Sequence, residues 1–492
     1  MSSSLSLPPK LNAIHQTLLE FAPHATLVGG AVRDLILHRP VRDLDYVVEG
    51  NGLRIGRKLA DKLGAAYYPL DESRKIARVV WKQEDDVIVV DISSLIGITL
   101  EEDIRRRDFT INAIAMRGQG QIFDPLAGVK DLKQGILRPC SPDSLYNDPV
   151  RTIRAVRFLH LFHLKPAPGL DSLVWHAAPG LTRISPERQR DEFIKLLAID
   201  QPHLAIEQMQ DWRITDVLLP ELAALIDVKQ PKPHIFDVYR HTLQTLYWLS
   251  RLDAWILHEA PAENKIEIKI QQRLQEIRPA LQRYLQEPLT SANQRWLWLR
   301  FAALAHDWGK PRAFRLGENN QIHFYGHEQL SATMAADWME RHHCARSEIN
   351  FVRQVCAAHM RPLSMIQEGK PSARALFRFY RDVGDAAPAT IILFLADFLG
   401  MRGEKTPSSE LDLALENVVS FLTPFVENED ASPIPPPLLK GKTIIEMFNL
   451  QPGPQIGQLL SSLQEAQAAG EVQTLEQAIE YVKTLLQENQ SP

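Results

Sequence analysis

The chain has 492 residues, a length that predicts about three domains rather than one. Hydrophobic residues make up 45%, which is enough for buried cores, and charged residues make up 23%, as expected for a soluble protein. The formal net charge of −5 argues against a protein that coats nucleic acid, although local clusters of Lys and Arg can still hold RNA.

Neither a membrane nor an oxidising compartment is expected. No stretch approaches the roughly 18 uncharged apolar residues of a membrane span, and the Ser- and Pro-rich segment Met1–Lys10 lacks the apolar region of a secretory signal. Cys140, Cys344 and Cys356 are far apart and form no CxxC pair, so we expect neither a disulfide framework nor a cysteine zinc site. The sequence therefore predicts a cytoplasmic protein with no membrane partner.

The first 139 residues alternate strand-like and helix-like segments. Ala25–Gly30, Leu44–Val48 and Val87–Ile92 are short apolar runs bounded by turn residues, as strands are. Gly52–Leu63 has helical spacing. This part is predicted to be a small head domain of mixed helices and sheet.

The remainder of the chain is predicted to be nearly all helical. Asp148–Leu164 and Pro186–Ile199 carry apolar residues at i, i+3 and i+4. The charged segment Glu263–Arg295 has the character of an inserted arm, and residues 425–438, with the run Pro433–Pro437, that of an exposed linker. We therefore predict an α+β fold with four domains: the head, 1–139; a helical domain, 140–232; a larger helical domain, 233–425; and a helical tail, 426–492.

The segment Leu27–Val48, LVGGAVRDLILHRPVRDLDYVV, holds the most informative pattern. A short strand runs into Gly29 and Gly30, and a helix is predicted to begin directly after them. Glycines let the backbone approach a ligand closely, and the start of a helix offers unpaired N–H groups to a phosphate. Arg33, one turn into the helix, adds a positive charge for the same anion.

Two aspartates follow on the next predicted strand. Asp43 and Asp45 are two residues apart, so their carboxylates project from the same face of a strand. Neighbouring carboxylates repel each other unless a cation lies between them, and Mg²⁺ is the usual one. Two such ions can activate a 3′ hydroxyl group and stabilise a departing pyrophosphate, so both aspartates are predicted catalytic residues and metal ligands. Asp91, at the end of the third strand, is a candidate third carboxylate.

Alone, a Gly-Gly pair is usually a turn and an Asp-x-Asp a solvated strand end, but their combination with Arg33 is much rarer. GGAVRD followed by RDLDYVV resembles the head motif of the polymerase-beta-like nucleotidyltransferases, specifically the class II CCA-adding enzymes and bacterial poly(A) polymerases. Glu101–Ala115, EEDIRRRDFTINAIA, resembles the second motif of that family, and Asp124–Leu137 the connector after it. The resemblance implies nucleotide-binding roles for Gly29, Gly30, Arg33, Arg107, Asp108 and Asn112.

The segment DPVRTIRAVRF places Arg151, Arg154 and Arg157 on one side of a helix, with Asp148 one turn before them. A carboxylate beside a bidentate guanidinium can hydrogen-bond the edge of a base as a complementary base would, although by itself the pattern also fits a helix with an exposed basic face. The resemblance implies that Asp148 and Arg151 read the base of CTP or ATP. It assigns phosphate contacts to three arginines: Arg107, Arg154 and Arg157.

The sequence departs from the family pattern at two positions. Asn147 stands where the family often has an acidic residue directly before the base-reading aspartate, here Asp148. The asparagine keeps a hydrogen-bond acceptor but lacks the negative charge. His38 stands where glycine is common before the Arg-Pro turn. Both leave the choice of nucleotide open. In the next helix of the family pattern, Arg188, Glu192 and Lys195 are predicted to be structural ion-pair partners.

A second, ordered series of metal-type residues lies between residues 241 and 397. His241, His306, Asp307 and Asp397 can surround one divalent ion, and His327 and His359 a second. The series resembles the HD phosphohydrolase superfamily, as do AHDWGKP and FYGHEQLSA, and some bacterial CCA-adding enzymes carry such a domain. We therefore interpret 233–425 as an HD domain with a divalent metal whose identity is open. Because HD domains often persist as scaffolds, hydrolysis of a phosphomonoester or a 2′,3′-cyclic phosphate also stays open.

Residues 341–381 hold eight basic residues against two acidic ones, Glu348 and Glu368. Such a stripe suits a tRNA backbone recognised by shape and phosphate, with a solvated helical face as the alternative. The tail, in which Pro452-Gly453-Pro454 leads into a helix whose start can take a phosphate, resembles the tail of HD-containing CCA-adding enzymes. We expect tRNA as the partner, bound at its 3′ end and elbow.

The leading hypothesis is a template-independent nucleotidyltransferase that restores CCA to the 3′ end of tRNA from CTP and ATP with Mg²⁺. Enzymes that add only A or only CC, and poly(A) polymerases, share these motifs, and the family ties the choice to the segment that Tyr67–Trp81 occupies here. A different class is a metal phosphohydrolase whose head binds a regulatory nucleotide. A third alternative, a non-enzymatic RNA-binding scaffold, gives no role to Asp43 and Asp45. The sequence does not indicate the oligomeric state.

Overall fold

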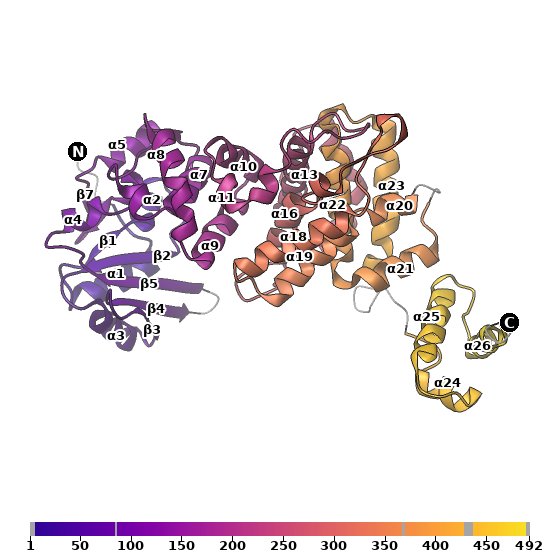
Figure 1. Cartoon of the computed structure of the whole chain (residues 1–492). Helices are drawn as coiled ribbons and strands as arrows, with labels where there is room; N and C mark the ends of the chain where they lie inside the picture. The colour runs from indigo at the N-terminus through magenta and orange to yellow at the C-terminus, as the bar shows by residue number, and fades with distance from the viewer. Residues whose placement is uncertain (1–4, 84–85, 367–369, 428–435, 489–492) are drawn as a thin grey trace. The chain divides into compact units, whose positions relative to one another are not determined.

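The computed structural model describes residues 5–83, 86–366, 370–427 and 436–488 (Figure 1). The chain forms two compact units: one comprises Met1–Glu192 and Asp211–Leu218, the other Phe193–Gln210 and Leu219–Pro492. The first unit holds the main sheet and the second is almost entirely helical, so the predicted α+β class is confirmed. The finer division into four domains stays a prediction.

A seven-stranded mixed sheet forms the centre of the first unit. Its order is β3-β4-β5-β2-β1-β6-β7, in which β2 and β5 are parallel and the other neighbours antiparallel. The strands are β1 (Thr26–Val28), β2 (Asp43–Val48), β3 (Ala66–Asp71), β4 (Ile76–Gln83), β5 (Asp86–Ser94), β6 (Ala115–Arg117) and β7 (Gln121–Phe123). Two short pairs lie outside it, β8 (Ile136–Leu137) with β9 (Lys165–Pro166) and β10 (Arg315–Leu316) with β11 (Ile322–His323).

The three predicted strands of the head are present as β1, β2 and β5, and the predicted helix is α3 (Gly52–Leu63). Strands β3, β4, β6 and β7 were not predicted from the sequence. Strands β6 and β7 have three residues each, too few to show a period. Strand β3 is largely exposed and contains Pro69, which an edge strand tolerates. In strand β4 the buried residues Ala77 and Val79 alternate with less buried ones, so the sequence does contain the two-residue period of a strand at this place.

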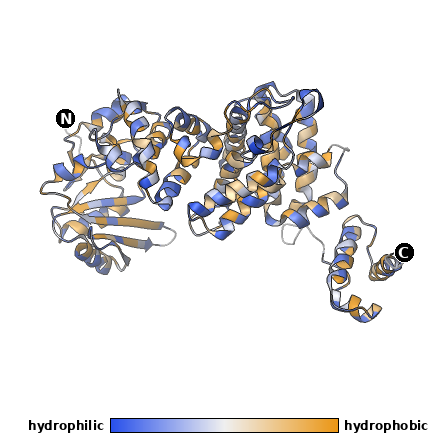
Figure 2. Cartoon of the chain, in the orientation of Figure 1, coloured by the Kyte–Doolittle hydropathy of each residue, from blue (hydrophilic) through white to orange (hydrophobic). Residues whose placement is uncertain are grey.

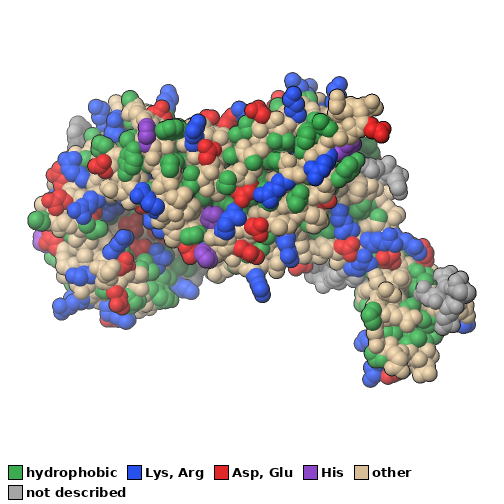
Figure 3. Space-filling view, viewed as in Figure 1, with side chains coloured by type: hydrophobic (Ala, Val, Ile, Leu, Met, Phe, Trp, Pro, Cys, Tyr) green, Lys and Arg blue, Asp and Glu red, His purple; other side chains and the backbone are tan. Residues whose placement is uncertain are grey.

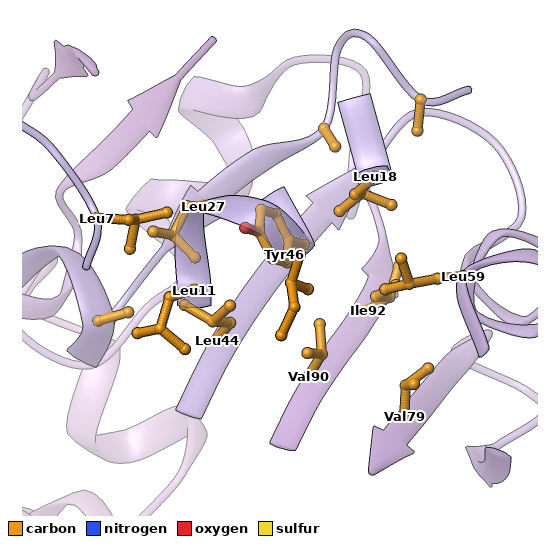
Figure 4. Close-up of a cluster of buried hydrophobic side chains, with 14 of the residues drawn as sticks. Leu7, Leu11, Leu18, Leu27, Leu44, Tyr46, Leu59, Val79, Val90 and Ile92 are labelled. Atoms are coloured by element: carbon orange, nitrogen blue, oxygen red, sulfur yellow. The ribbon is translucent and has the colours of Figure 1, made fainter. Parts of the chain in front are cut away.

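The larger core of the head lies on one face of this sheet, against α1 (Pro9–Leu19) and α3, and a smaller cluster that includes Val28, Val47 and Ile104 lies on the other. Figure 4 shows the strand residues of this core, Leu27, Leu44, Tyr46, Val79, Val90 and Ile92, with Leu11, Leu18 and Leu59 from the helices. Helix α3 lies close to β4, because a β-carbon on Gly56 would be 2.5 Å from that of Ala77. Since successive strand residues face opposite sides, the other face carries Asp43, Asp45, Arg78 and Asp91.

The helices that follow or interrupt this sheet are short. They are α2 (Gly30–Ile36), α4 (Leu100–Arg105), α5 (Gly128–Gln134), α6 (Ser144–Asn147), α7 (Arg151–Leu161), α8 (Leu170–Ala177), α9 (Pro186–Leu197), α10 (Pro202–Asp211), α11 (Thr215–Leu218) and α12 (Pro220–Ala223). Helices α7 and α9 are the two predicted after the head. Helix α7 begins later than predicted because Asp148 precedes Pro149 and is extended, with φ −145° and ψ 88°.

Helices also build the second unit, many with a hydrophobic stripe beside a hydrophilic one (Figure 2). They are α13 (Val238–His258), α14 (Lys265–Leu274), α15 (Arg278–Gln286), α16 (Arg295–Ala305), α17 (Lys310–Ala313), α18 (His327–Arg341), α19 (Arg346–Ala358), α20 (Arg361–Ile366), α21 (Ala373–Val383), α22 (Ala387–Gly400) and α23 (Ser408–Glu427). The segment interpreted as an inserted arm forms α14 and α15. It is not a free arm, because Ile270, Leu274, Leu281 and Leu285 are buried.

The helical stretch Ala373–Gly400 is long and apolar enough to cross a membrane, contrary to the expectation that no segment qualifies. A membrane span tolerates an occasional charged residue, so a long apolar helix qualifies even though it contains no run of about 18 uncharged residues. However, 78% of its most apolar window is buried inside the protein, which is the pattern of a core helix.

The tail consists of α24 (Gly441–Phe448), α25 (Pro454–Ala468) and α26 (Leu475–Glu488). These helices share a small core of their own that includes Ile444, Leu459, Leu463 and Val482. The predicted helical tail is therefore present. Most of the predicted linker before it, residues 428–435, lies outside the described residues.

Candidate active site

Asp43 and Asp45 lie on the face of β2 that is turned away from the core. Leu44 and Tyr46 are buried, whereas Asp43 is exposed and Asp45 half-buried. The parallel pairing of β2 with β5 aligns Asp45 with Asp91. Three carboxylates therefore share one face of the sheet, and carboxylate oxygens are the ligands that hard divalent cations prefer.

The glycine turn lies directly beside these carboxylates. Gly29 has φ 77° and ψ −139°, a conformation that favours glycine. A β-carbon on Gly29 would lie 3.5 Å from Asp45 Oδ2 and 3.3 Å from Arg107 Nη1. Arg107 Nη2 donates to Asp103 Oδ2 at 3.3 Å, and its buried Nε has no hydrogen-bond partner among the residues described. An unused buried donor beside the turn suits an anionic ligand.

The environment of Asp45 disfavours its charged form when no cation is bound. Burial raises the pKa of Asp45, the charges of Asp91 and Asp43 raise it further, and Arg107 opposes them, so that the pKa reaches about 6. A divalent cation between the carboxylates would remove this repulsion. The donor set, all oxygen and all on one face, thus fits a cation such as Mg²⁺.

Four of the residues predicted to bind nucleotide form one buried network instead of pointing to open space. Arg33 Nη1 donates to Asn112 Oδ1, and Asn112 Nδ2 donates to Asp108 Oδ1 at 3.1 Å. Arg154 donates to Asp108 Oδ2 from Nε at 2.9 Å and from Nη2 at 2.7 Å. Burial raises the pKa of Asp108, but the charge of Arg154 and the hydrogen bonds that the carboxylate accepts together outweigh burial, so the net pKa is lowered. Contact between these four side chains and a nucleotide stays a prediction.

Glu192 joins two arginines of α7. Its carboxylate accepts hydrogen bonds from Arg157 Nε and, at 3.4 Å, from Arg154 Nη1. The Glu192 residue is only 5% exposed. This is the geometry of the structural ion pair predicted for Glu192. The phosphate contacts predicted for Arg154 and Arg157 stay a prediction, and both guanidinium groups are already engaged.

Asp148 and Arg151 lie side by side, with Arg151 Nε 3.8 Å from Asp148 Oδ2. Arg151 is held by the backbone, because its Nη1 donates to the carbonyl oxygens of Arg107 and Ser144, each at 3.1 Å. Asp148 Oδ2 accepts from Arg188 Nη2 at 2.8 Å, whereas the buried Oδ1 has no partner among the residues described. A fixed guanidinium beside a free carboxylate oxygen is the donor and acceptor pair that base reading needs.

Arg78 is a residue of this site that the sequence analysis missed. It donates from Nε and Nη2 to the two carboxylate oxygens of Asp91, both at 2.8 Å. The alternation of β4, in which Ala77 and Val79 are buried, places Arg78 on the carboxylate face and would have revealed it.

Within the second unit, the structure brings the other metal-type series together. Ligand atoms within 4.8 Å of one another form two groups, one of His241, His306 and Asp397 and one of Asp307, His327 and His359. His241 Nε2 lies 2.8 Å from Asp397 Oδ1, and His327 Nε2 lies 3.3 Å from His359 Nε2. Asp307 therefore groups with the second pair of histidines, although its Oδ2 is also 3.3 Å from His306 Nε2.

The chemistry of this cluster fits a bound cation. Among the residues described, His241 Nδ1 is buried without a hydrogen-bond partner, His241 Nε2 lies against Asp397, and the buried Oδ2 of Asp307 is 2.7 Å from Lys310 Nζ. Burial lowers the pKa of His306, but the Asp307 and Asp397 carboxylates outweigh burial and raise it to about 10. The cluster therefore attracts positive charge, and its mixed nitrogen and oxygen donors suit a transition-metal ion.

A cavity of about 590 Å³ opens onto the cluster. Its lining includes Asp307, His327, His359 and Asp397 of the cluster, together with Lys310, Phe324 and Tyr325. A cavity of this size accommodates a small ligand beside the metal-type residues.

Lys and Arg side chains gather over α21, within the predicted basic stripe (Figure 3). Arg374 donates to Glu471 Oε2 at 2.5 Å and Arg378 to Glu465 Oε2 at 2.8 Å, both in exposed pairs with the tail. Exposed pairs contribute little stability and are screened by salt, so they do not remove the stripe as a phosphate-binding surface. Glu368 lies outside the described residues.

Comparison with known families finds three matching models along the chain. "Poly A polymerase head domain" matches residues 25–138, "Probable RNA and SrmB- binding site of polymerase A" matches 167–226, and "HD domain" matches 280–401. The HD match begins within α15, inside the segment that had been interpreted as an arm.

Similar proteins of known name align along nearly the whole chain. The A-adding tRNA nucleotidyltransferase of Deinococcus radiodurans is 33% identical over 480 residues, which are 95% of this chain and 97% of that protein. The CC-adding tRNA nucleotidyltransferase of Thermus thermophilus is 29% identical over 462 residues, 92% of this chain and 91% of that protein. A solved CCA-adding enzyme with ATP shares the fold at a TM-score of 0.65 and 21% identity, with 98% of this chain and 96% of that chain covered.

Proposed function

The chain belongs to the tRNA nucleotidyltransferase family, and from this premise we propose that it adds the CCA end to the 3′ terminus of tRNA, using CTP and ATP. The observation that carries the proposal is the arrangement of Asp43 and Asp45 on one strand face beside the Gly29 turn. Solved relatives described as CCA-adding enzymes with ATP, with CTP and with tRNA agree with these substrates.

The reaction assigned to this site is a single displacement at phosphorus. The 3′ oxygen of the RNA forms a bond to the α-phosphorus of the incoming nucleotide, and the bond from that phosphorus to the β-phosphate breaks, so that pyrophosphate leaves with the electron pair. Asp43 and Asp45, with Asp91 beside them, would hold Mg²⁺, which lowers the pKa of the attacking hydroxyl group and neutralises the leaving pyrophosphate. Arg107, with its unused Nε, is placed to bind the triphosphate beside the Gly29 turn.

Asp148 and Arg151 are proposed to choose the nucleotide. Arg151 is fixed by the backbone carbonyl oxygens of Arg106, Arg107 and Ser144 and keeps a second hydrogen on Nη2 as a donor, while the free Oδ1 of Asp148 offers an acceptor. Cytosine and adenine each present an exocyclic amino donor next to a ring-nitrogen acceptor, so both match this pair. Because Asn147 lacks a negative charge, selection would depend on Asp148 for its carboxylate.

The extent of addition is the open part of this proposal, because relatives with full-length similarity add A or CC. Purified protein should be incubated with Mg²⁺, labelled CTP or ATP, and tRNA that ends at the discriminator base, at C or at CC. Full CCA addition predicts product from all three RNAs, with CTP used on the first two and ATP on the third. An A-adding enzyme extends only the CC-ended RNA, and a poly(A) polymerase produces long tails. Absence of any extension contradicts the proposal.

A second candidate activity rests on the metal-type cluster of the HD domain. His241, His306, Asp307 and Asp397 are proposed to hold a divalent metal, which would supply an activated water for hydrolysis of a phosphate ester in the adjoining cavity. Conversion of RNA ending in a 2′,3′-cyclic phosphate to RNA ending in a phosphomonoester and a free hydroxyl group, lost in Asp307→Ala, would support it. Because the relatives named above are bacterial tRNA nucleotidyltransferases, we propose that both activities are cytoplasmic.

A further inference from the structure

Four side chains form one row across the head sheet, from the candidate catalytic carboxylates to the sheet edge. Tyr68 of β3 is paired with Arg78 of β4, Arg78 with Asp91 of β5, and Asp91 with Asp45 of β2. Residues that oppose each other in neighbouring strands point to the same face. The outermost strand of this half of the sheet is β3, so the row ends at an open edge.

Among the described residues of the first unit, the part of this face formed by β3, β4 and β5 is open, whereas Val28 and Val47 on the side of β1 are buried against Ile104 of α4. Helices α1 and α3 cover the opposite face. On the face of the row, Tyr68 is 52% exposed and Val87 54%, and Val80 and Val89 are only half-buried. A tyrosine ring and apolar side chains next to an active site are thus available to a ligand.

Arg78 has binding capacity left after its contact with Asp91. Its Nε and Nη2 are used for the two oxygens of Asp91, while among the described residues no acceptor is recorded for Nη1. The side chain is 42% exposed. A guanidinium can bind a second anion through its remaining donors, and phosphate is the anion that RNA supplies.

We propose that this row is the platform for the 3′-terminal nucleotides of the RNA acceptor. Arg78 contacts a backbone phosphate and Tyr68 stacks on a base, while the 3′ oxygen lies at the carboxylates. The inference rests on the proposed nucleotidyl transfer and adds the residues that hold its acceptor strand.

The direction of the row agrees with the geometry of the reaction. The Gly29 turn and Arg107 lie at Asp45 on the side of β1, where they are proposed to hold the triphosphate. An in-line attack brings the 3′ oxygen from the side opposite to the leaving pyrophosphate. The row leaves Asp45 in that other direction and reaches about 14 Å to β3 at about 4.8 Å per strand, enough for the last nucleotide and part of the one before it.

The same features argue for RNA over a protein strand added to the sheet edge. Pro69 lies in the middle of β3 and has no N–H to donate, and the pairing with β4 is irregular between Pro69 and Asp71. Both features hinder the addition of another strand. A cation followed by an exposed aromatic ring is the combination with which proteins hold single-stranded nucleic acid.

Steady-state kinetics on the full-length enzyme with tRNA ending in CC test the proposal. Tyr68→Ala is expected to raise KM for the RNA about tenfold, while KM for ATP and kcat stay unchanged. Tyr68→Phe keeps the ring and should behave like the wild type. An unchanged KM for the RNA in Tyr68→Ala, or an equal increase in Tyr68→Phe, overturns the stacking role.

Salt dependence tests the phosphate contact of Arg78. Arg78→Gln is expected to reduce the slope of log KM for RNA against log salt by about 1, whereas the matched control Arg54→Gln, on α3 and the opposite face, should not change it. An unchanged slope in Arg78→Gln means that Arg78 only positions Asp91, and this overturns the contact. If the wild type extends no RNA, the proposed function fails, which is distinct from either result.

Crosslinking of the unaltered protein avoids any question about folding of the variants. A tRNA acceptor that ends in 4-thiouridine followed by C is irradiated in the complex and the peptides are identified by mass spectrometry. A crosslink within β3 or β4 supports the platform. Crosslinks confined to α3 or to other elements overturn it.

Discussion

Asp45 and Asp91 lie directly opposite each other on the parallel strands β2 and β5, with Asp43 on the same face. Asp45 and Asp91 are far apart in the sequence, so only the pairing of β2 with β5 brings their charges together. This relationship explains why the pKa of Asp45 is raised, first by burial and then by the charge of Asp91. It also gives the proposed metal site its third oxygen donor.

In metal-free protein, the raised pKa of Asp45 predicts a loss of stability as the pH rises. An unfolded aspartate loses its proton near pH 4, whereas folded Asp45 keeps it until about pH 6, so ionisation becomes a cost between these values and remains one above them. Asp45→Asn should raise the free energy of unfolding by at most about 3 kcal/mol at pH 7.5, and the gain should vanish at pH 4. Thermal unfolding in EDTA measures both. A gain of equal size at the two pH values would contradict this origin.

Arg151→Ala should blur the choice between CTP and ATP more than it weakens the binding of RNA. Guanidinium contacts to a base edge discriminate by about 1–3 kcal/mol, so kcat/KM for the wrong nucleotide should approach that for the right one. Single-nucleotide addition to tRNA ending in C or CC measures this ratio. The control is Arg183→Ala, because Arg183 is exposed and lies outside α7. Equal losses with both nucleotides, with the ratio intact, would contradict the reading role.

Glu192→Gln should destabilise the fold strongly. It removes the charge that pairs with Arg157 and Arg154 and leaves two mostly buried guanidinium groups less compensated, with an expected cost of about 3–5 kcal/mol. The adjacent Asp191→Asn is the matched control, because Asp191 is exposed and paired with Arg190, so its loss should cost about 0–1 kcal/mol. Chemical denaturation measures the two values. Similar values for both variants would show that Glu192 does not brace α7.

Binding of a divalent metal to the HD cluster should raise the melting temperature of the protein. A metal ion at 100 times its dissociation constant stabilises the folded state by about 2.7 kcal/mol. Thermal unfolding with Mn²⁺ or Ni²⁺, in an Asp43→Ala/Asp45→Ala background that removes the proposed head site, should show the increase in the parent and in His258→Ala, a control on the exposed end of α13, but not in Asp307→Asn. A persisting increase in Asp307→Asn would place the metal elsewhere.

The parts of the site that were predictable from the sequence are those whose residues are close in the chain. Gly29 with Gly30, and Asp43 with Asp45, carry their geometry in local turn and strand spacing, and the structure has them in that geometry. The α+β class and helix α3 were predictable for the same reason, because their patterns repeat over several residues.

Contacts between distant strands could not be predicted in this way. The pairing of Arg78 with Asp91 depends on the antiparallel register of β4 and β5, which no local pattern specifies. Likewise, the network that joins Arg33, Asn112, Asp108 and Arg154 brings three separate segments together, so side chains expected at a ligand are found bonded to one another. Burial decides whether an arginine pairs with other side chains or stays available to bind phosphate. It depends on the whole fold and not on the local sequence.

The central claim is that the head carboxylates, and not the HD cluster, perform nucleotide addition. The most direct measurement compares Asp43→Ala with Asp307→Ala for incorporation of labelled nucleotides from CTP and ATP into tRNA lacking its CCA end. The account predicts that Asp43→Ala abolishes incorporation while Asp307→Ala retains it at the wild-type rate. Incorporation that survives in Asp43→Ala, or that is lost in a folded Asp307→Ala, would contradict it.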